Sequence, residues 1–172
     1  MATISGRSSR VSRSLTTAPG LPKQRGKSIQ TEKSLTHEDA KRALDAMAAE
    51  RAPKGLKAVL AVADNHGELI GLLRLAGAPL ASIQIAANKA YTSARERKPS
   101  RAVGKASRDP ANGFDIAYFG DPRITGWGGG VPVLVGGECV GAFAVSGLSE
   151  DEDVELAEIG VKAILAEANA RS

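Results

Sequence analysis

The sequence predicts an α+β fold, in which an antiparallel sheet of about five strands is flanked by helices as a layered α-β-α sandwich. Two observations support this prediction: the strand-like runs come in pairs joined by short glycine-containing turns, and helical segments precede and follow each pair. Strands joined by such tight turns run antiparallel, and their apolar faces must be covered by helices. The 172 residues are enough for one compact domain with a sizeable core.

The first half of the domain is predicted to be helix, hairpin, helix. A helix is expected to begin at Thr36, an N-cap residue followed three residues later by Asp39, and to stop at Pro53. The run "LKAVLAVAD", the turn "NHG" and the run "ELIGLLRL" predict an antiparallel hairpin. Residues 79–98 then show helical periodicity. The apolar residues expected on the inward face of this helix are Leu80, Ile83, Ala87, Ala90, Tyr91 and Ala94.

The second half contains a long connection, a second hairpin and a final helix. Residues 98–130 are rich in turn residues and show no clear period, which predicts a functional or mobile connection. The runs "VPVLVGG" and "ECVGAFAVSG" predict a hairpin, in which Gly136 and Gly137 supply the positive φ angles of a type I′ turn. The last helix is expected over residues 150–169, and its acidic start suits the positive end of the helix dipole.

The positive net charge of the chain lies in its N-terminal segment. Residues 1–33 hold seven Lys or Arg against one Glu, whereas residues 34–172 hold sixteen against eighteen Asp or Glu. We interpret residues 1–33 as a flexible basic tail and residues 34–172 as the domain, a division that argues against nucleic-acid binding by a folded face. An Arg- and Ser-rich start is also a feature of organelle transit peptides. The sequence shows no secretory signal and no membrane span, and we expect a cytoplasmic protein.

Four segments, taken together, resemble the GlcG/HbpS family of haem-binding-like proteins, which also occurs as the C-terminal domain of PduO-type proteins. The resemblance covers roughly residues 35–168. It implies an antiparallel five-stranded sheet flanked by helices, assembly into homo-oligomers and, in some members, binding of haem or corrinoid-related ligands. The segments that carry it are "AVADNHGELIGLLRLAGAP", "ANKAYTSA", "GGGVPVLVGGECVGAFAVSG" and "DEDVELAEIGVKAI".

Haem is therefore a candidate cofactor, and it needs an axial ligand in an apolar slot. His37 lies in the first turn of the first helix, the region that supplies a haem-ligating histidine in some relatives, and Thr92 is a second candidate by resemblance. An exposed residue of a helical first turn is the other interpretation of His37, and a turn residue is the interpretation of His66. Cys139 is expected to be a small buried thiol. No set of residues has metal-ligand spacing, so no metal site is expected.

The segment "KAYT" and the glycine-rich "GWGGG" predict a small-ligand site. Lys89 and Thr92 are three residues apart on one helix and share a face that is otherwise largely apolar. A lysine there either extends its ammonium group to solvent or binds an anion or carbonyl. The loop Trp127–Gly130 either directs its amides toward a bound anion or only leads into the next strand. The predicted ligand-binding residues are Lys89, Thr92, Trp127, Gly128, Gly129 and Gly130.

Three functions are compatible with these features. The first is a small-ligand-binding oligomer of the GlcG/HbpS type, with haem or another planar or carboxylate-bearing ligand. The second is a small enzyme, or an accessory subunit to one, that transfers a proton in or isomerises a small carbonyl or carboxylic acid compound. In that case Lys89 is the acid–base group and the glycine loop holds the oxyanion. The third is a structural partner protein that uses the basic tail for contact.

Overall fold

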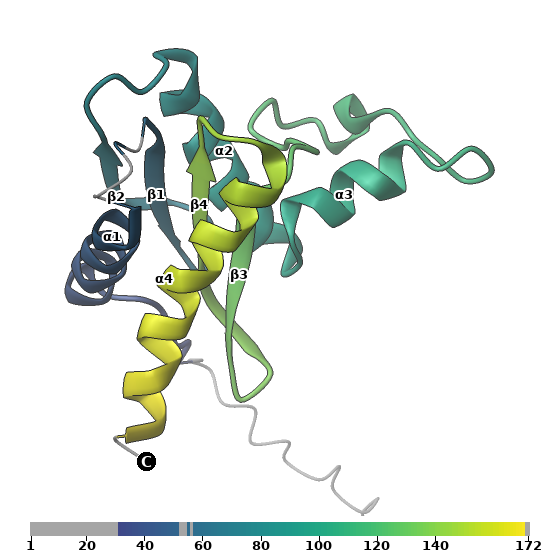
Figure 1. The fold of residues 1–172 in the computed structure, drawn as a ribbon. Coiled ribbons are helices and arrows are strands. Elements are labelled where there is room, and N and C mark those ends of the chain that lie inside the picture. Colours follow the sequence, from purple (N-terminus) through teal and green to yellow (C-terminus); the bar gives the residue numbers. More distant parts are fainter. Residues whose placement is uncertain (1–30, 52–54, 56, 171–172) are drawn as a thin grey trace, which may run out of the picture. The chain divides into compact units, whose positions relative to one another are not determined.

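The computed structural model describes residues 31–51, 55 and 57–170. These residues form the predicted α+β fold, in which an antiparallel sheet lies between helices (Figure 1). The helices are α1 (His37–Arg51), α2 (Ala81–Glu96), α3 (Ser100–Ser107), the short 3-10 helix η2 (Ile116–Phe119) and α4 (Glu150–Ala170). The strands are β1 (Val59–Asp64), β2 (Leu69–Arg74), β3 (Gly130–Val135) and β4 (Glu138–Ser146).

The sheet has the strand order β2-β1-β4-β3, and all neighbouring strands are antiparallel. The described residues form four strands, against the prediction of about five. The two hairpins, β1–β2 and β3–β4, are those expected from the sequence, and they join through their β1 and β4 strands at the centre of the sheet. Because β1 and β4 are covered on both faces, almost all of their residues are buried.

Each face of the sheet packs against its own helical layer. Helices α1 and α4 pack against each other and cover one face, and α2 covers the opposite face, with α3 beside it (Figure 1). The core under α1 and α4 consists of large apolar side chains, including Met47, Leu60, Phe143, Val145 and Leu156. The core under α2 is built almost entirely of small ones, chiefly Ala61, Ala63, Ala86, Ala90 and Ala144.

The local signals at the start of α1 and at the second hairpin are confirmed. The Thr36 hydroxyl accepts a hydrogen bond from the Asp39 amide (3.3 Å), and the Asp39 carboxylate accepts one from the Thr36 amide (2.8 Å). This reciprocal pair satisfies donors that the first turn of a helix leaves open. Gly136 and Gly137 both have positive φ, 61° and 84°, as a type I′ turn requires. Pro53, the predicted helix stop, lies outside the described residues.

The structure differs from the sequence prediction in two elements. Residues 98–130 are not simply irregular, because they contain α3 and η2. Helix α3 has only 8 residues, and its buried positions are Ser100, Val103 and Gly104, so it lacks the apolar stripe that reveals a longer helix. Leu80 does not face inward as predicted: it is 71% exposed at the N-terminal end of α2. Most of the predicted tail, residues 1–30, lies outside the described residues, so the boundary at residue 33 stays a prediction.

Candidate functional site

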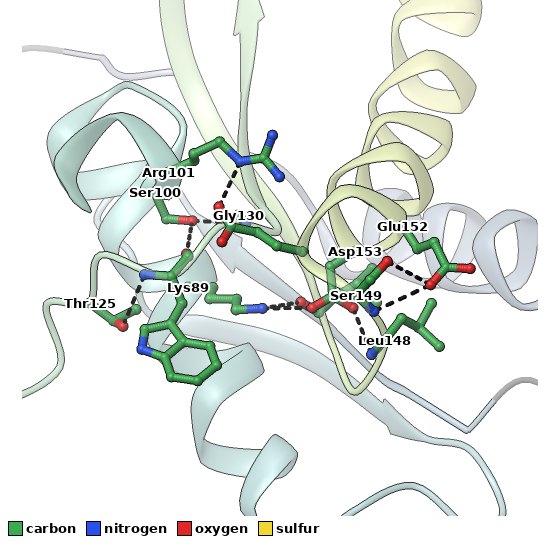
Figure 2. A network of polar contacts seen from close by, with 12 residues as sticks. Lys89, Ser100, Arg101, Thr125, Gly130, Leu148, Ser149, Glu152 and Asp153 are labelled. Atoms are coloured by element: carbon green, nitrogen blue, oxygen red, sulfur yellow. Dashed lines mark hydrogen bonds and ion pairs between the residues drawn. The ribbon is translucent and has the colours of Figure 1, made fainter. Parts of the chain in front are cut away.

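Lys89, the centre of the predicted ligand site, is buried in the second half of α2 with only 1% of its surface exposed. Its ammonium group donates a hydrogen bond to the Val145 carbonyl oxygen of β4 (3.0 Å). It also forms an ion pair with the Asp153 carboxylate in the first turn of α4, with 2.8 Å between Nζ and Oδ2 (Figure 2). The side chain therefore begins in the helical layer on one face of the sheet and ends at the helical layer on the other.

Asp153 is the partner that the sequence interpretation missed. It belongs to the acidic start of α4, which the helix dipole alone explains, yet it is buried while Glu150 and Asp151 are exposed. Its second carboxylate oxygen accepts a hydrogen bond from the Leu148 amide (3.2 Å). Burial raises the pKa of Asp153 above its ordinary value, and the bonds from Lys89 and the Leu148 amide oppose that rise.

The glycine loop reaches Lys89, as predicted, but the contact is one of close backbone packing. Gly129 has a φ of +113°, and a Cβ atom there would lie 2.9 Å from Lys89 Nζ and 2.6 Å from the Val145 carbonyl oxygen. A Cβ atom on Gly130 would lie 2.4 Å from the Lys89 carbonyl oxygen. Glycine at position 129 thus leaves the space that the Lys89 ammonium group occupies, and glycine at position 130 lets the loop approach the backbone of α2.

Thr92 and Ser100 fix the glycine loop to the helices, and Figure 2 shows the contact between Ser100 and Gly130. The Thr92 hydroxyl donates to the Asn88 carbonyl oxygen (2.8 Å) and accepts from the Thr125 amide (2.9 Å). The Ser100 hydroxyl donates to the Trp127 carbonyl oxygen (2.6 Å) and accepts from the Gly130 amide (3.0 Å). Each hydroxyl group thus donates one hydrogen bond and accepts another, and together the two groups hold residues 125–130 against α2 and α3.

A second polar cluster binds residues 121–123, which precede the glycine loop, to α2. The Tyr91 hydroxyl donates to the Asp121 carboxylate (2.6 Å), and the Arg123 guanidinium lies 3.9 Å from the centre of the Tyr91 ring and binds Asp121 as well. Hydrogen bonds from Arg123 and Tyr91 hold the pKa of Asp121 well below its usual range. Burial, together with the bond to Asp121, raises the pKa of Tyr91. Nothing in the sequence pattern pointed to this cluster.

The candidate haem ligands lie on different sides of the sheet. The His37 side chain is 83% exposed in the first turn of α1, where Nε2 lies 3.1 Å from a Glu38 carboxylate oxygen. Thr92 is fully buried in α2, on the opposite face of the sheet, so one chain does not bring the two residues together. His66 lies in the β1–β2 turn, with 3.3 Å between its Nε2 and a carboxylate oxygen of Glu32. Cys139 is half-buried, with Sγ 3.4 Å from the Gly141 carbonyl oxygen.

Two further features of the described residues bear on function. Within residues 31–51, 55 and 57–170, His, Cys, Asp and Glu side chains nowhere gather in a group of three that could hold a metal ion. None of the helices in the same ranges combines the length and apolar character needed to cross a membrane.

The fold and these contacts can be compared with known proteins. A family model described as haem-degrading protein HbpS-like matches residues 35–162, about three quarters of the sequence. The chain belongs to the HbpS-like family. An uncharacterised 15.0 kDa protein from the dhaT–dhaS intergenic region of Citrobacter freundii is 30% identical over 125 residues, which are 73% of this chain and 88% of the relative. GlcG of Escherichia coli K12 is 34% identical over 87 residues, 51% of this chain and 62% of GlcG.

Solved structures of HbpS and PduOC have the same fold as this chain. HbpS superimposes with a TM-score of 0.70 at 27% identity, over 82% of this chain and 96% of HbpS. A haem complex of PduOC superimposes with a TM-score of 0.69 at 21% identity, over 76% of this chain and 94% of PduOC, a likeness that concerns the fold alone. The resemblance to the GlcG/HbpS family expected from the four sequence segments is therefore confirmed.

Proposed function

We propose that this HbpS-like protein binds haem and that the imidazole of His37 would ligate the iron. The family description names haem, and a protein of the same fold, PduOC, has been crystallised with haem. Haem, when bound, would supply a redox-active iron, and His37 would provide the donor atom that sets the coordination of that iron.

The observation that carries this proposal is the position of His37. The sequence has two histidines, and His37 lies on a helix whose first turn is held by the Thr36–Asp39 hydrogen bonds, so its backbone is fixed while its imidazole is accessible. A change of rotamer releases Nε2 from Glu38, because that pair is exposed and weak. Methionine and cysteine can also ligate haem iron, but Met47 is fully buried in the core and the Cys139 sulfur lies near backbone carbonyl oxygens, so neither fits as well.

His37 thus supplies an accessible imidazole donor for iron at the protein surface, whereas its exposed surroundings beside Glu38 are not in themselves the apolar slot that haem requires. Thr92 remains a proposed ligand, and it would have to give up its hydrogen bonds with Asn88 and Thr125 to reach iron. The contacts of Lys89 favour a structural role over proton transfer in a catabolic enzyme. Its ammonium group is buried, paired with Asp153 and bonded to Val145, so a substrate would have to displace both partners.

Haemin titration of the full chain tests the proposal, with absorption spectra recorded for three proteins. The wild type and His66→Ala are expected to give a saturable, shifted Soret band, because His66 lies in a different loop. His37→Ala should bind haemin more weakly or give a different band position, since the axial donor sets the iron's ligand field. A His37→Ala spectrum and affinity equal to those of the wild type would refute His37 as the ligand. An unshifted band in the wild type would refute haem binding itself.

A further inference from the structure

The domain leaves four aromatic side chains exposed, and all of them lie within residues 114–127. The sequence has one Trp, two Tyr and three Phe, of which Tyr91 and Phe143 are buried. The exposed ones are Phe114, Tyr118, Phe119 and Trp127. Tyr118 is 83% exposed and Trp127 is 65% exposed. Aromatic side chains left in water forgo the largest burial free energy available to a side chain. Grouped on one segment, they are typical of a surface that another molecule covers.

The exposed aromatic residues belong to one projecting region. The rings of Phe114 and Phe119 meet edge to face, with 5.7 Å between their centres. Ile116, which lies between them in η2, packs on the backbone before Trp127, because a Cβ atom on Gly126 would lie 3.2 Å from the Ile116 Cδ1 atom. Trp127 is therefore close to η2. Figure 1 shows α3 and the loop that follows it extending away from the sheet, so these side chains lie on a convex part of the domain.

Residues 97–127, which include α3 and η2, are also the basic part of the domain, and we call them the α3 segment. They hold six Lys or Arg against three Asp, a net charge of +3, whereas the rest of residues 34–172 holds ten against fifteen Asp or Glu, a net charge of −5. Three of the cations, Arg97, Lys105 and Arg108, are exposed and form no ion pair within the described parts of the chain. The exposed aromatic side chains therefore lie on a surface that attracts anions.

Local hydrogen bonds hold the α3 segment in a defined shape. The Asp109 carboxylate accepts bonds from the amides of Ala111 (2.9 Å) and Asn112 (2.7 Å). The Asp115 carboxylate accepts one from the Ala117 amide (2.9 Å). Two of the three acids of the segment are thus engaged by its own backbone. The order of a segment whose aromatic side chains stay in water has a conformational-entropy cost that burial within the chain does not offset. A partner that takes up these side chains would offset it.

We propose that the α3 segment docks the protein on the surface of a bilayer that contains anionic lipids. Tyr and Trp are enriched where a bilayer meets water, because one part of each side chain is apolar and another part forms hydrogen bonds. Each Lys or Arg close to an anionic lipid surface adds to the attraction. Docking of this kind needs no membrane-spanning helix, since the projecting apolar side chains enter the headgroup region while the rest of the domain stays in water.

The shape of the α3 segment favours a bilayer over a nucleic acid, the other anionic partner that binds aromatic side chains. Single-stranded nucleic acids bind in a groove that follows their backbone, with bases stacked on open aromatic faces. The α3 segment instead projects from the domain (Figure 1), and Phe114 and Phe119 use one ring face for their contact with each other. A projecting group of side chains suits a soft, flat lipid surface better than a strand that needs a groove.

The fluorescence of Trp127 in the full chain tests the proposal, because Trp127 is the only Trp of the sequence and belongs to the α3 segment. Vesicles of phosphatidylcholine mixed with phosphatidylglycerol should shift its emission to shorter wavelength and protect it from acrylamide, a quencher dissolved in the water. Vesicles of phosphatidylcholine alone should have a much smaller effect. Added salt should weaken binding to the anionic vesicles, because it screens the attraction between the cations and the headgroups.

A double variant tests the aromatic contribution. Tyr118→Ser with Phe119→Ser should lower the partition constant for anionic vesicles by about 10-fold or more, because less apolar surface leaves the water on docking. Leu134→Ser is the matched control: Leu134 is 46% exposed on the β3–β4 hairpin, outside the α3 segment, and its replacement should leave vesicle binding unchanged. Circular dichroism checks that the variants fold.

A second double variant tests the charge. Lys105→Gln with Arg108→Gln should lower the partition constant for anionic vesicles by about 10-fold or more, because two cations near the lipid surface are lost. Lys162→Gln is its matched control, since Lys162 is an exposed lysine of α4, outside the α3 segment, and its loss should have little effect.

Each alternative partner gives a distinct result that would overturn the proposal. Trp127 emission that is already at short wavelength in the free protein, and that vesicles do not change, would assign the surface to a second copy of the chain. Vesicle binding that both double variants leave at the wild-type level would assign the lipid contact to the basic residues 1–33. An emission change caused by a single-stranded oligonucleotide, but not by vesicles, would assign the surface to nucleic acid. Equal binding to vesicles with and without phosphatidylglycerol would remove the role of the cations.

Discussion

Replacing Lys89 with methionine should destabilise the fold strongly, because it leaves Asp153 buried without its counter-ion. Removing one partner of a buried ion pair typically costs about 3–5 kcal/mol. Protonation sets an independent upper limit on this cost, because the unpaired Asp153 carboxylate can take up a proton and become neutral. At pH 7 that protonation costs about 4.4 kcal/mol relative to the unfolded chain, at about 1.36 kcal/mol for each pKa unit between the ordinary 3.8 of Asp and pH 7.

The loss should depend on pH in a defined direction. Without Lys89, burial still raises the pKa of Asp153 in the folded protein above its value in the unfolded chain. A raised carboxyl pKa lowers stability as the pH rises from the unfolded pKa to the folded pKa. The deficit of Lys89→Met should therefore be up to about 2.7 kcal/mol smaller at pH 5 than at pH 7. Urea unfolding at fixed protein concentration, compared with the wild type at each pH, measures it.

The double variant Lys89→Met with Asp153→Leu is the control for this reasoning. Removing both charges together is often nearly neutral, so the double variant should recover most of the lost stability. If the free energy of unfolding of Lys89→Met lies within about 1 kcal/mol of the wild-type value at pH 7, the buried ion pair does not stabilise the fold as argued. A pH-independent deficit would be equally damaging, since it would mean that Asp153 is not the source of the cost.

Two smaller predictions concern the glycine loop and its anchor. Gly129→Ala should lower the free energy of unfolding by about 3–5 kcal/mol, because the new Cβ atom needs a left-handed backbone and overlaps Lys89. Gly136→Ala, in a turn with open space around it, should lower it by only about 1–2 kcal/mol. Equal losses in urea unfolding would show that the space around Gly129 does not matter. Thr92→Val should cost about 1–3 kcal/mol, because the half-buried Thr125 amide loses its acceptor. If Thr92→Val instead keeps full stability but changes the haemin spectrum, Thr92 is a ligand and not an anchor.

The sequence predicted those parts of the fold that depend on local signals. The Thr36–Asp39 cap and the Gly136–Gly137 turn are read directly from residues that neighbour each other in the chain, and both are confirmed. The fold class and the family followed from the order of such segments. Contacts between distant segments could not be predicted from local patterns. The expectation that Lys89 lies beside Gly129, for example, came from the fold of the family.

The features that the sequence did not predict depend on which side of a helix packs against which neighbouring element. Asp153 was counted with the other acids of the α4 start, although it lies four residues before Ala157, a buried residue, and hence on the inward side of the helix. That spacing, combined with a lysine on a largely apolar helix, was the available signal for the ion pair. Leu80 fits the helical period but lies before the part of α2 that the sheet covers, so its apolar character misled the inward prediction.

The two cores of the sheet should respond to mutation in opposite ways. On the side of α1 and α4, large side chains such as Phe143 and Leu156 fill the space, so shrinking them creates cavities. On the side of α2, alanines of the sheet and of the helix, for example Ala61 and Ala90, belong to one buried cluster, so a larger side chain there would push the helix away from the sheet. Variation across homologous sequences should therefore exchange one aliphatic residue for another on the first side, and stay confined to alanine, glycine and serine on the second.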